Sequence, residues 1–567
     1  MSLLAETAAA EASRARADEL VAWLRHYAAE RLNSRLNDER RCLPPYVILD
    51  FGNRGLLGMQ VPEAYGGLGL QHADTLRVLE QLGAIDLTLA VIVFTHGILG
   101  TRPILGHAPP ALRDELLPTL AAGRELAAFA LSEPGAGSNI GAIAGEARPD
   151  GRGGWRVRAL KRWNSSGWAG VISVFVRLVD DRGRPGGLTG FVVRQGVPGL
   201  RVGPEALTMG LRASVQNELI FENVAVGPDV LLGEPGRGME VAGDALTSGR
   251  LGIAAVSLGG LRRCAQLLVR YGGRRAVASG RLVENPVVLE TLGELAGLID
   301  ALEALKNQAA ARLDAGKPVP AEVAMAAKVI GSDALNWAAG RLMQFLGGRG
   351  YMENNLAPQI LRDARLLSIG EGPNEPLTTQ VGRMTRHTNT IAAYLGSDPA
   401  AAELAAALPE VAGRCLSGSG PFADRSSAQL WADALIGRVA CEALLLAATR
   451  EAHRARSDDR LARALVWAEG RFAAALRRAR DGRPEDRVIP DAAEVDALVA
   501  RYAGAIGDVE QGLAGVDEGL DPLLRRVPGP APAPADLPGH VVIPAVADPV
   551  GVAPPPRRAL DGVAAER

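Results

Sequence analysis

The sequence predicts an α+β protein that is mostly helical, and three observations lead to this fold class. Apolar residues recur at three- and four-residue spacing from Glu11 to about Arg124, for example in ADELVAWLRHYAAERL. Between residues 127 and 232 the runs become short, β-branched and bounded by Gly, Pro, Asp and Asn. Helical periodicity returns at Glu240. This order predicts helical domains on either side of a β-rich middle domain.

Each domain follows from its own pattern. The glycine-rich stretch PEAYGGLGL interrupts the first helices, and the runs GWRVRAL, GVISVFVRLV, LTGFVVR and QNELIFENVAV predict strands. Long amphipathic segments then predict a helical bundle and a further helical extension. The Pro/Ala-rich end cannot bury enough apolar surface to fold alone, so we interpret it as a linker or docking tail. The predicted domains are an N-terminal helical domain at 1–126, a middle β domain at 127–235, a four-helix bundle at 236–395, an extension at 396–525 and the tail at 526–567.

Composition excludes several classes of protein. The 567 residues are 47% hydrophobic and 22% charged, which suits a large buried core. A net charge of -2 offers no basic field for nucleic acid. The four cysteines are far apart, match no metal-ligand spacing and are interpreted as packing residues of a cytoplasmic protein. The N-terminus does not resemble a secretory signal, and no apolar run approaches the ~18 residues of a membrane span.

Three segments carry candidate chemistry, and each has an ordinary alternative. FALSEPGAGSNIG, residues 129–141, brings Ser132 and Ser138 as donors into a glycine-rich stretch, although such a stretch is more often a plain loop. LKRWNSSGWAG, residues 160–170, offers the aromatic plane of Trp163, which could equally fill a core. LSIGEGPNEPL, residues 367–377, places Glu371 between glycines, as a base or as part of a solvated turn.

Seven segments that occur in one order favour the functional interpretation of these three segments over the ordinary alternatives. PEAYGGLGL, ALSEPGAGSN, RWNSSG, GLRASVQNELIFENVAV, LTSGRLGIAA, FLGGRGYM and RDARLLSIGEGPNE, across roughly residues 50–385, resemble the acyl-CoA dehydrogenase family. The Gly249-Arg250 pair, GYM at 350–352 and the long C-terminal extension look most like its very-long-chain branch. The resemblance implies the family's fold: a helical domain, a β-barrel-like middle domain and a bundle, with FAD between the last two.

The resemblance also implies roles for residues. Glu371 would be the catalytic base, and Arg250 would position its loop. Substrate would meet Ser138, Arg250, Gly370 and Glu371, and Gln344, Gly347 and Gly348 would reach the FAD of a partner subunit in a homodimer. The residues expected at FAD are Phe129, Leu131, Ser132, Gly137, Ser138, Trp163, Asn164, Ser165, Arg275, Gln344, Gly347, Gly348, Gly372 and Asn374.

The family reaction explains why these residues are needed. Making a 2-enoyl thioester removes a proton from the α-carbon and a hydride from the β-carbon, and the flavin accepts the hydride. The backbone N–H of Glu371 would stabilise the enolate oxygen, and burial would raise the pKa of Glu371. Some members place the base just before the arginine, and Gly249 stands there, so Glu371 would act alone.

Several positions depart from the family pattern. Ala278 and Ser279 replace a Phe-Gly pair after Arg275, Asn139 replaces Asp, Pro373 replaces Thr, and Gly370 stands where an aromatic residue is common. These changes fit altered FAD binding with retained activity, which we favour, or a silent scaffold that has lost the reaction. The substrate could be an acyl-CoA or an acyl-carrier protein, and the electron acceptor an electron-transferring flavoprotein or oxygen. We expect no nucleic-acid partner.

Overall fold

The computed structural model describes residues 3–168, 170–180, 182–417, 422, 424–481 and 490–507. By its contacts the chain divides into two units, Met1–Asp508 and Val509–Arg567, and the first holds every element described below. The predicted tail at 526–567 lies outside the described residues.

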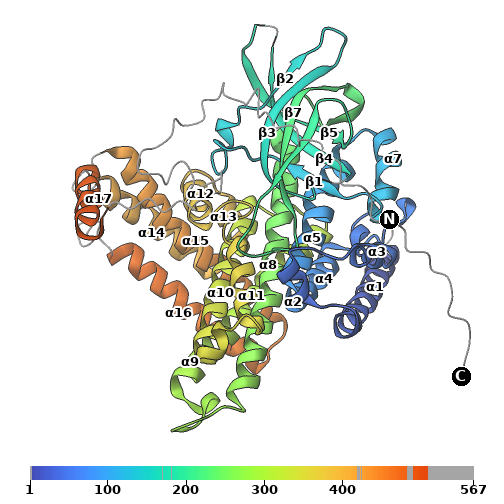
Figure 1. The fold of residues 1–567 in the computed structure, drawn as a ribbon. Helices are drawn as coiled ribbons and strands as arrows, with labels where there is room; N and C mark the ends of the chain where they lie inside the picture. The colour runs from blue at the N-terminus through green and yellow to red at the C-terminus, as the bar shows by residue number, and fades with distance from the viewer. Residues whose placement is uncertain are drawn as a thin grey trace, which may run out of the picture. The chain divides into compact units, whose positions relative to one another are not determined.

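Helices build the first 121 residues, as the periodicity predicted (Figure 1). Pro at the first helical positions of α3 and α7 and the Asp86 cap of α5 explain where these helices begin. PEAYGGLGL forms a short 3₁₀ turn, η2 (Glu63–Tyr65), and a loop, so it interrupts the helices as predicted. The helices are α1 (Leu3–Glu30), α2 (Ser34–Arg40), α3 (Pro45–Asn53), α4 (His72–Ile85), α5 (Leu87–Phe94), α6 (Arg102–His107) and α7 (Pro110–Ala121).

One continuous helix in this domain corrects the sequence analysis. A π-helical stretch, η3 (Thr95–Thr101), joins α5 to α6, so the helix runs from Leu87 to His107. This helix is long and apolar enough to cross a membrane, since the mean hydropathy of its most apolar window is 1.4. However, 72% of that window is buried inside the protein. The expectation that no segment reaches this length was wrong, because the helix continues through polar residues. Its burial is typical of a core helix.

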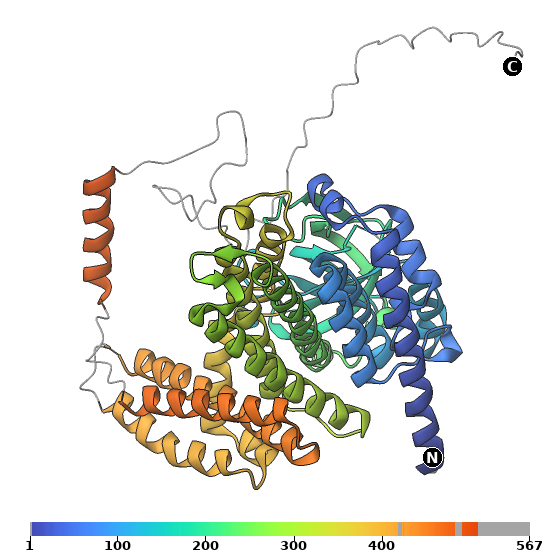
Figure 2. The same ribbon diagram turned by 90° about the horizontal axis from the view of Figure 1, so that it is seen from below.

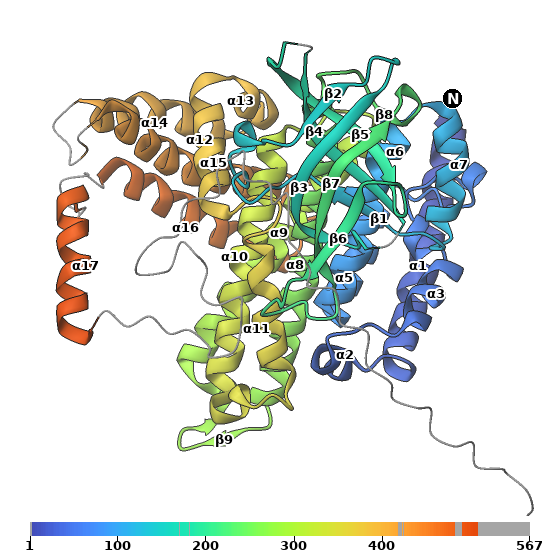
Figure 3. The ribbon, with the colours of Figure 1, turned by 45° about the horizontal axis from the view of Figure 1, so that its top comes forward.

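An eight-stranded sheet follows, and the four strands predicted from sequence are β3, β4, β5 and β7. The order is β6-β7-β3-β2-β4-β5-β8, with β1 parallel to β4 so that Ala127 lies opposite Val171. Figure 3 shows the sheet above α5, with α6 and α7 beside it. The strands are β1 (Ala127–Ala130), β2 (Glu146–Pro149), β3 (Trp155–Ser165), β4 (Val171–Val179), β5 (Pro185–Arg194), β6 (Leu200–Glu205), β7 (Gln216–Val226) and β8 (Leu231–Leu232).

Buried His96 joins the first helices to the sheet. Its Nδ1 accepts from the Ala127 N–H at 3.0 Å, which leaves Nε2 as the donor to the Leu120 carbonyl at 3.1 Å. Burial lowers the pKa of His96 to about 4, so the ring is neutral and its tautomer is fixed by these two bonds.

The bundle domain begins with the longest helix, α8, against which α4 and α10 pack. A Cβ added at Gly83 of α4 or at Gly259 of α8 would overlap backbone of the other helix, so glycine allows this close crossing. A hairpin, β9 (Ala276–Val277) and β10 (Gly280–Arg281), follows α8. The helices are α8 (Gly238–Gly272), α9 (Pro286–Asp314), α10 (Ala321–Leu346), α11 (Leu356–Leu367), α12 (Asn374–His387) and α13 (Thr390–Leu395).

The helical extension packs on the bundle through α15, which contacts α9 and α12 (Figure 2). Buried leucines of α15 belong to the main core cluster, and the burial of each is worth about 1.5–3 kcal/mol: Leu435, Leu444, Leu445 and Leu446. The extension comprises α14 (Pro399–Leu416), α15 (Arg425–Ala455), α16 (Asp459–Asp481) and α17 (Ala492–Ile506).

The cysteines divide into two groups. Cys264, Cys415 and Cys441 are buried, as the packing interpretation predicted, whereas Cys42 is exposed in the turn after α2 and corrects it. Within the described residues no group of three or more His, Cys, Asp and Glu side chains could hold a metal ion.

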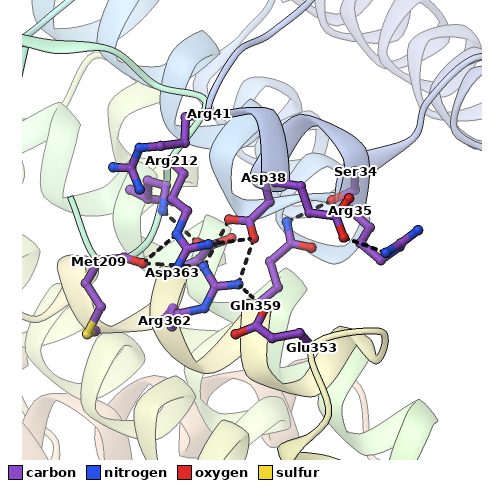
Figure 4. Close-up of polar contacts among 12 residues, drawn as sticks. Ser34, Arg35, Asp38, Arg41, Met209, Arg212, Glu353, Gln359, Arg362 and Asp363 are labelled. Carbon is purple, nitrogen blue, oxygen red and sulfur yellow. Dashed lines mark hydrogen bonds and ion pairs between the residues drawn. The ribbon is translucent and has the colours of Figure 1, made fainter. Parts of the chain in front are cut away.

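A polar cluster joins the N-terminal helices, the 207–214 loop of the middle domain and α11 (Figure 4). Arg362 makes two hydrogen bonds to the Asp38 carboxylate, at 3.0 and 2.7 Å. The Leu211 N–H donates to Asp363 at 2.6 Å, and Arg41 donates to the Thr208 carbonyl at 2.8 Å. Three segments far apart in the sequence are therefore fixed at one point.

Candidate active site

Glu371 lies in the loop that joins α11 to α12. Its φ is +58°, and Gly372 follows with φ +95°, so two consecutive residues occupy the left-handed region. A non-glycine residue there costs roughly 1–2 kcal/mol, and such strain is concentrated at functional sites. Gly370 has no positive φ, so only Gly372 of the two flanking glycines is required by the backbone. Pro373, at φ -57° and ψ 148°, is the N-cap of α12 and ends the strained turn.

The Glu371 carboxylate has an unsatisfied oxygen. Oε2 is buried and has no hydrogen-bond partner in the described part of the protein. Burial raises the pKa of Glu371, and the charges of Arg250 and Lys328 oppose that increase. A Cβ built on Gly249 would stand 3.7 Å from Oε2 and 2.9 Å from Leu99. The position where some family members carry the base therefore borders this carboxylate, and Leu99 crowds any side chain that would replace the glycine there.

Arg250 reaches this loop from α8. Its guanidinium is buried, and Nε donates to the Glu371 carbonyl at 3.3 Å. Burial lowers the pKa of Arg250, and the charge of Glu371 opposes the decrease. The structure thus brings Arg250 and Glu371 together: the guanidinium binds the backbone oxygen of Glu371, and Oε2 of its carboxylate has no hydrogen-bond partner among the described residues.

Lys328, on α10, also holds the loop, and the sequence analysis missed it. Its side chain is 0% exposed, and Nζ donates to the Gly372 carbonyl and to Asn374 Oδ1, both at 2.7 Å. The available signal was its place in the apolar stripe of AEVAMAAKVIG, where a lysine needs a buried partner. Asn374, predicted at FAD, is buried, and its Nδ2 donates to Ser332 and Asp333, so its side chain is occupied in supporting the loop.

A second group of predicted residues lies at the sheet. Arg162 N–H donates to the Ser132 carbonyl at 3.1 Å, which joins the loop after β1 to β3. Buried Lys161 bonds the Leu131 carbonyl at 3.0 Å and Glu133 at 2.7 Å, and Glu133 accepts from the N–H of Gly145. This buried pair fixes the glycine-rich loop, while Gly137 and Ser138 beyond it are exposed.

Trp163 is presented outward from β3. The β3–β7 register shifts between Lys161 and Asn164, Trp163 has φ +62°, and its side chain is 65% exposed. The core-filling alternative for this tryptophan is therefore wrong. Asn164 is buried with Oδ1 unpartnered in the described residues, and Ser165 Oγ accepts from Gln216. A bulge with an exposed aromatic is typical of a strand that re-aims a side chain at a ligand.

The remaining residues predicted at FAD lie outside the two groups described above. Phe129 stacks against Phe175 with ring centroids 5.0 Å apart, next to buried Leu131. Gln344, Gly347 and Gly348 are exposed at the end of α10, sixteen residues or more beyond Lys328, or about 24 Å along the helix. Arg275 is exposed beside the β9–β10 hairpin, whose turn is Ala278 and Ser279.

Comparison with known families matches all three domains. The acyl-CoA dehydrogenase N-terminal domain matches residues 14–124, the middle domain residues 128–224 and the C-terminal domain residues 236–385. The chain belongs to the acyl-CoA dehydrogenase family of FAD-dependent oxidoreductases, as the sequence resemblance predicted.

The curated relatives include enzymes named for short-chain and for very-long-chain acyl-CoA substrates. The bovine mitochondrial short-chain specific acyl-CoA dehydrogenase is 32% identical over 60% of this chain and 82% of its own. A Bacillus subtilis acyl-CoA dehydrogenase is 34% identical over 59% and 87%. The very-long-chain specific enzyme of Macaca fascicularis is 30% identical over 63% of this chain and 56% of its own.

Solved structures agree on the fold. Butyryl-CoA dehydrogenase from Megasphaera elsdenii is 26% identical with a TM-score of 0.62, covering 65% of this chain and 98% of that one. Glutaryl-CoA dehydrogenase from Mycobacterium smegmatis, in complex with FADH2, is 26% identical with a TM-score of 0.60, over 66% and 95%. An acyl-CoA dehydrogenase from Bacillus anthracis, complexed with FAD, shares the fold over 88% of this chain and 91% of its own, with a TM-score of 0.67 at 20% identity.

The residues present fit a flavin. Exposed Trp163 offers a flat face, and the unpartnered Asn164 Oδ1 lies at the next position. Cβ atoms added at Gly135 and Gly137 would meet open space, so a ligand can approach that backbone closely. We therefore assign the glycine-rich loop after β1 and the bulge of β3 as residues that would hold FAD.

Proposed function

We propose that this protein converts a saturated acyl thioester to its trans-2-enoyl thioester, with Glu371 as the base that removes the α-proton. One observation carries the proposal: a strained glutamate has a buried carboxylate oxygen that no group in the described protein satisfies. A native protein rarely leaves such an oxygen without a partner unless a ligand supplies one.

The chain's own groups divide the work as follows. Glu371 takes the proton through its carboxylate, and its raised pKa brings it nearer to neutral pH. Its backbone N–H makes no hydrogen bond among the described residues, so it is free to donate to the thioester oxygen as negative charge develops there. Arg250 holds the Glu371 carbonyl and so helps to fix the loop that carries this N–H. Bound FAD supplies the acceptor for the hydride from the β-carbon.

The proposal extends to substrate, acceptor and assembly. The acyl group is carried by CoA or by an acyl-carrier protein, and electrons leave to an electron-transferring flavoprotein in the cytoplasm. Two copies form a dimer in which exposed Gln344, Gly347 and Gly348 face the partner's flavin. Scattering measurements of molecular mass test the dimer, and variants of Gly347 that lower flavin content would support its role.

Anaerobic bleaching of the flavin tests the reaction. The purified, yellow holoprotein is mixed with acyl-CoAs of several lengths and with acyl-carrier proteins, and loss of the flavin band is followed. Bleaching identifies the carrier and the chain length together. Reoxidation by air compared with reoxidation by an electron-transferring flavoprotein then separates a dehydrogenase from an oxidase.

Glu371→Gln tests the base. We expect flavin to remain bound and bleaching to be lost, because the amide cannot accept the proton. Bleaching at the wild-type rate would remove Glu371 from its role. Flavin that binds but is bleached by no thioester, even in the wild-type protein, would favour the silent scaffold.

A further inference from the structure

Lys328 differs from the other buried lysines of the described chain in lacking a carboxylate partner. Lys161 pairs with Glu133 and Lys306 pairs with Glu80, each at 2.7 Å. Lys328 makes no ion pair within 4 Å in the described residues, and its two hydrogen bonds go to neutral oxygens. Burying a cation without an opposite charge costs free energy, so this arrangement needs a reason.

The two oxygens that accept hydrogen bonds from Lys328 both belong to the segment that follows Glu371. The Gly372 carbonyl belongs to the second of the two left-handed residues, and the Asn374 side chain belongs to the first residue of α12. Asn374 is held in turn by Ser332 and Asp333, one helical turn beyond Lys328 on α10. Lys328 thus anchors the loop from the α10 side, while Arg250 anchors the adjacent Glu371 carbonyl from α8.

Charges from every neighbouring helix meet at this point. Arg250 of α8 and Lys328 of α10 both favour the ionised form of Glu371, against the effect of burial. Asp333 of α10 and Glu375 of α12 favour the charged form of Lys328, and Arg365 of α11 favours the charged form of Asp333. Burial lowers the pKa of Lys328 to about 8, and Glu371 is the first charge that opposes this decrease.

We propose that Lys328 is a positioning residue for the reaction: it fixes the loop in the conformation that aims Glu371, and its charge favours the carboxylate form of that base. This inference rests on the proposed role of Glu371. Lys328 itself touches neither the substrate nor the reacting atoms. A purely structural lysine would affect stability, whereas a positioning lysine also sets the pH at which the base works.

The test compares Lys328→Met with Lys306→Met in the flavin-bound, full-length protein. Both changes remove a buried lysine whose pKa is lowered to about 8, but Lys306 pairs with Glu80 and lies outside the loop. The anaerobic bleaching rate with a substrate acyl-CoA is measured from pH 5.5 to about 9.5. For Lys328→Met we expect the acidic limb to move to higher pH by about one unit or more, since a nearby opposite charge shifts a carboxylate by that amount. For Lys306→Met we expect the acidic side of the pH–rate profile to stay where it is in the wild-type protein.

A second readout reports the carboxyl group directly. The infrared band of the protonated acid that disappears in Glu371→Gln is titrated in each variant, and in Lys328→Met it should persist to higher pH. If Lys328→Met does not fold, Lys328→Gln carries the same test, because it removes the charge but keeps a donor for the Gly372 carbonyl. Lys328→Arg, which retains the charge, should restore the limb toward wild type.

The outcomes separate this inference from the proposed function. If Glu371→Gln abolishes bleaching but the Lys328 variants keep the wild-type limb and infrared titration, the role of Lys328 is overturned and the base stands. An equal shift in Lys306→Met would overturn it too, because any buried lysine would then serve. If Glu371→Gln still bleaches, the base assignment itself fails.

Discussion

Two of the six non-glycine residues with positive φ in the described chain lie in the candidate site: Trp163 and Glu371. Each of these conformations costs free energy that the surrounding contacts must supply. At Glu371 those contacts are the two cations, Arg250 and Lys328, on successive carbonyls. Strain and buried charge are thus combined at the residue that the proposed reaction uses.

This combination predicts a conflict between stability and function at Glu371. Compared with Glu371→Gln, Glu371→Gly should raise the free energy of unfolding by about 1 kcal/mol or more, because both changes remove the charge that faces Arg250 and Lys328 and only glycine tolerates φ +58°. Bleaching should be lost. Urea unfolding of the flavin-bound protein measures the first effect.

Glu375→Gly is the matched control, since Glu375 is exposed in the first turn of α12. It should lower stability by roughly 0.5–1 kcal/mol, the cost of glycine in a helix. A loss of stability in Glu371→Gly, relative to Glu371→Gln, as large as in the control would show that the left-handed turn is not strained.

Sequence reasoning found part of this site. Glu371, Arg250 and Trp163 could be named because their motifs are local and occur in a known order. Lys328 could not be assigned, because its meaning depends on a loop that lies 44 residues later along the chain. The bonds of Asn374, which was predicted at FAD, were hidden for the same reason: a sequence does not show that three groups of α10 bind its side chain.

At the scale of elements, long helices and central strands were predictable from periodicity, whereas β2, β6 and β8 were not named. These strands are short or mostly exposed, so neither length nor alternation marks them. The crossing of α12 and α15 was equally invisible. It depends on Gly382 and Gly437, where an added Cβ would overlap the backbone carbonyls of Asp433 and Thr378.

This crossing predicts that Gly437→Val is strongly destabilising. The added side chain has backbone as its neighbour and cannot be accommodated without separating α12 from α15, which should cost at least about 2 kcal/mol. Because α12 begins directly after the Glu371 loop, we also expect slower bleaching. Thermal unfolding and the bleaching rate are measured together.

Gly413→Ala provides the control for this substitution. Gly413 is exposed within α14, and an added Cβ would meet open space there. The change should raise stability by up to about 1 kcal/mol through helix propensity. Equal stabilities for the two variants and wild type would contradict the close crossing.

At the scale of the whole molecule, the polar cluster in Figure 4 fixes three domains at one point, and one of its acids is poorly placed for a charge. Burial raises the pKa of Asp363 to about 7, and the charges of Asp86 and Asp38 add to this effect. The Leu211 N–H and Arg362 favour the ionised form. No sequence pattern predicts this, because Asp38, Asp86 and Asp363 meet only in the folded chain.

The raised pKa predicts how stability depends on pH. The folded state binds a proton at Asp363 between pH 3.8, its ordinary value, and about 7, where the unfolded chain does not. The stabilisation from this proton is therefore full below pH 3.8 and is lost as pH rises to about 7, by up to about 4 kcal/mol.

Asp363→Asn should flatten this fall and be more stable than wild type at pH 8, since its Oδ1 can still accept from Leu211 and its amide can donate to the acids. Urea unfolding from pH 4.5 to 8 measures the difference, and Glu353→Gln, at an exposed carboxylate that also pairs with Arg362, should leave the slope unchanged. Parallel curves for wild type and Asp363→Asn would mean that Asp363 is charged throughout, and that the three domains meet around an ion rather than a neutral acid.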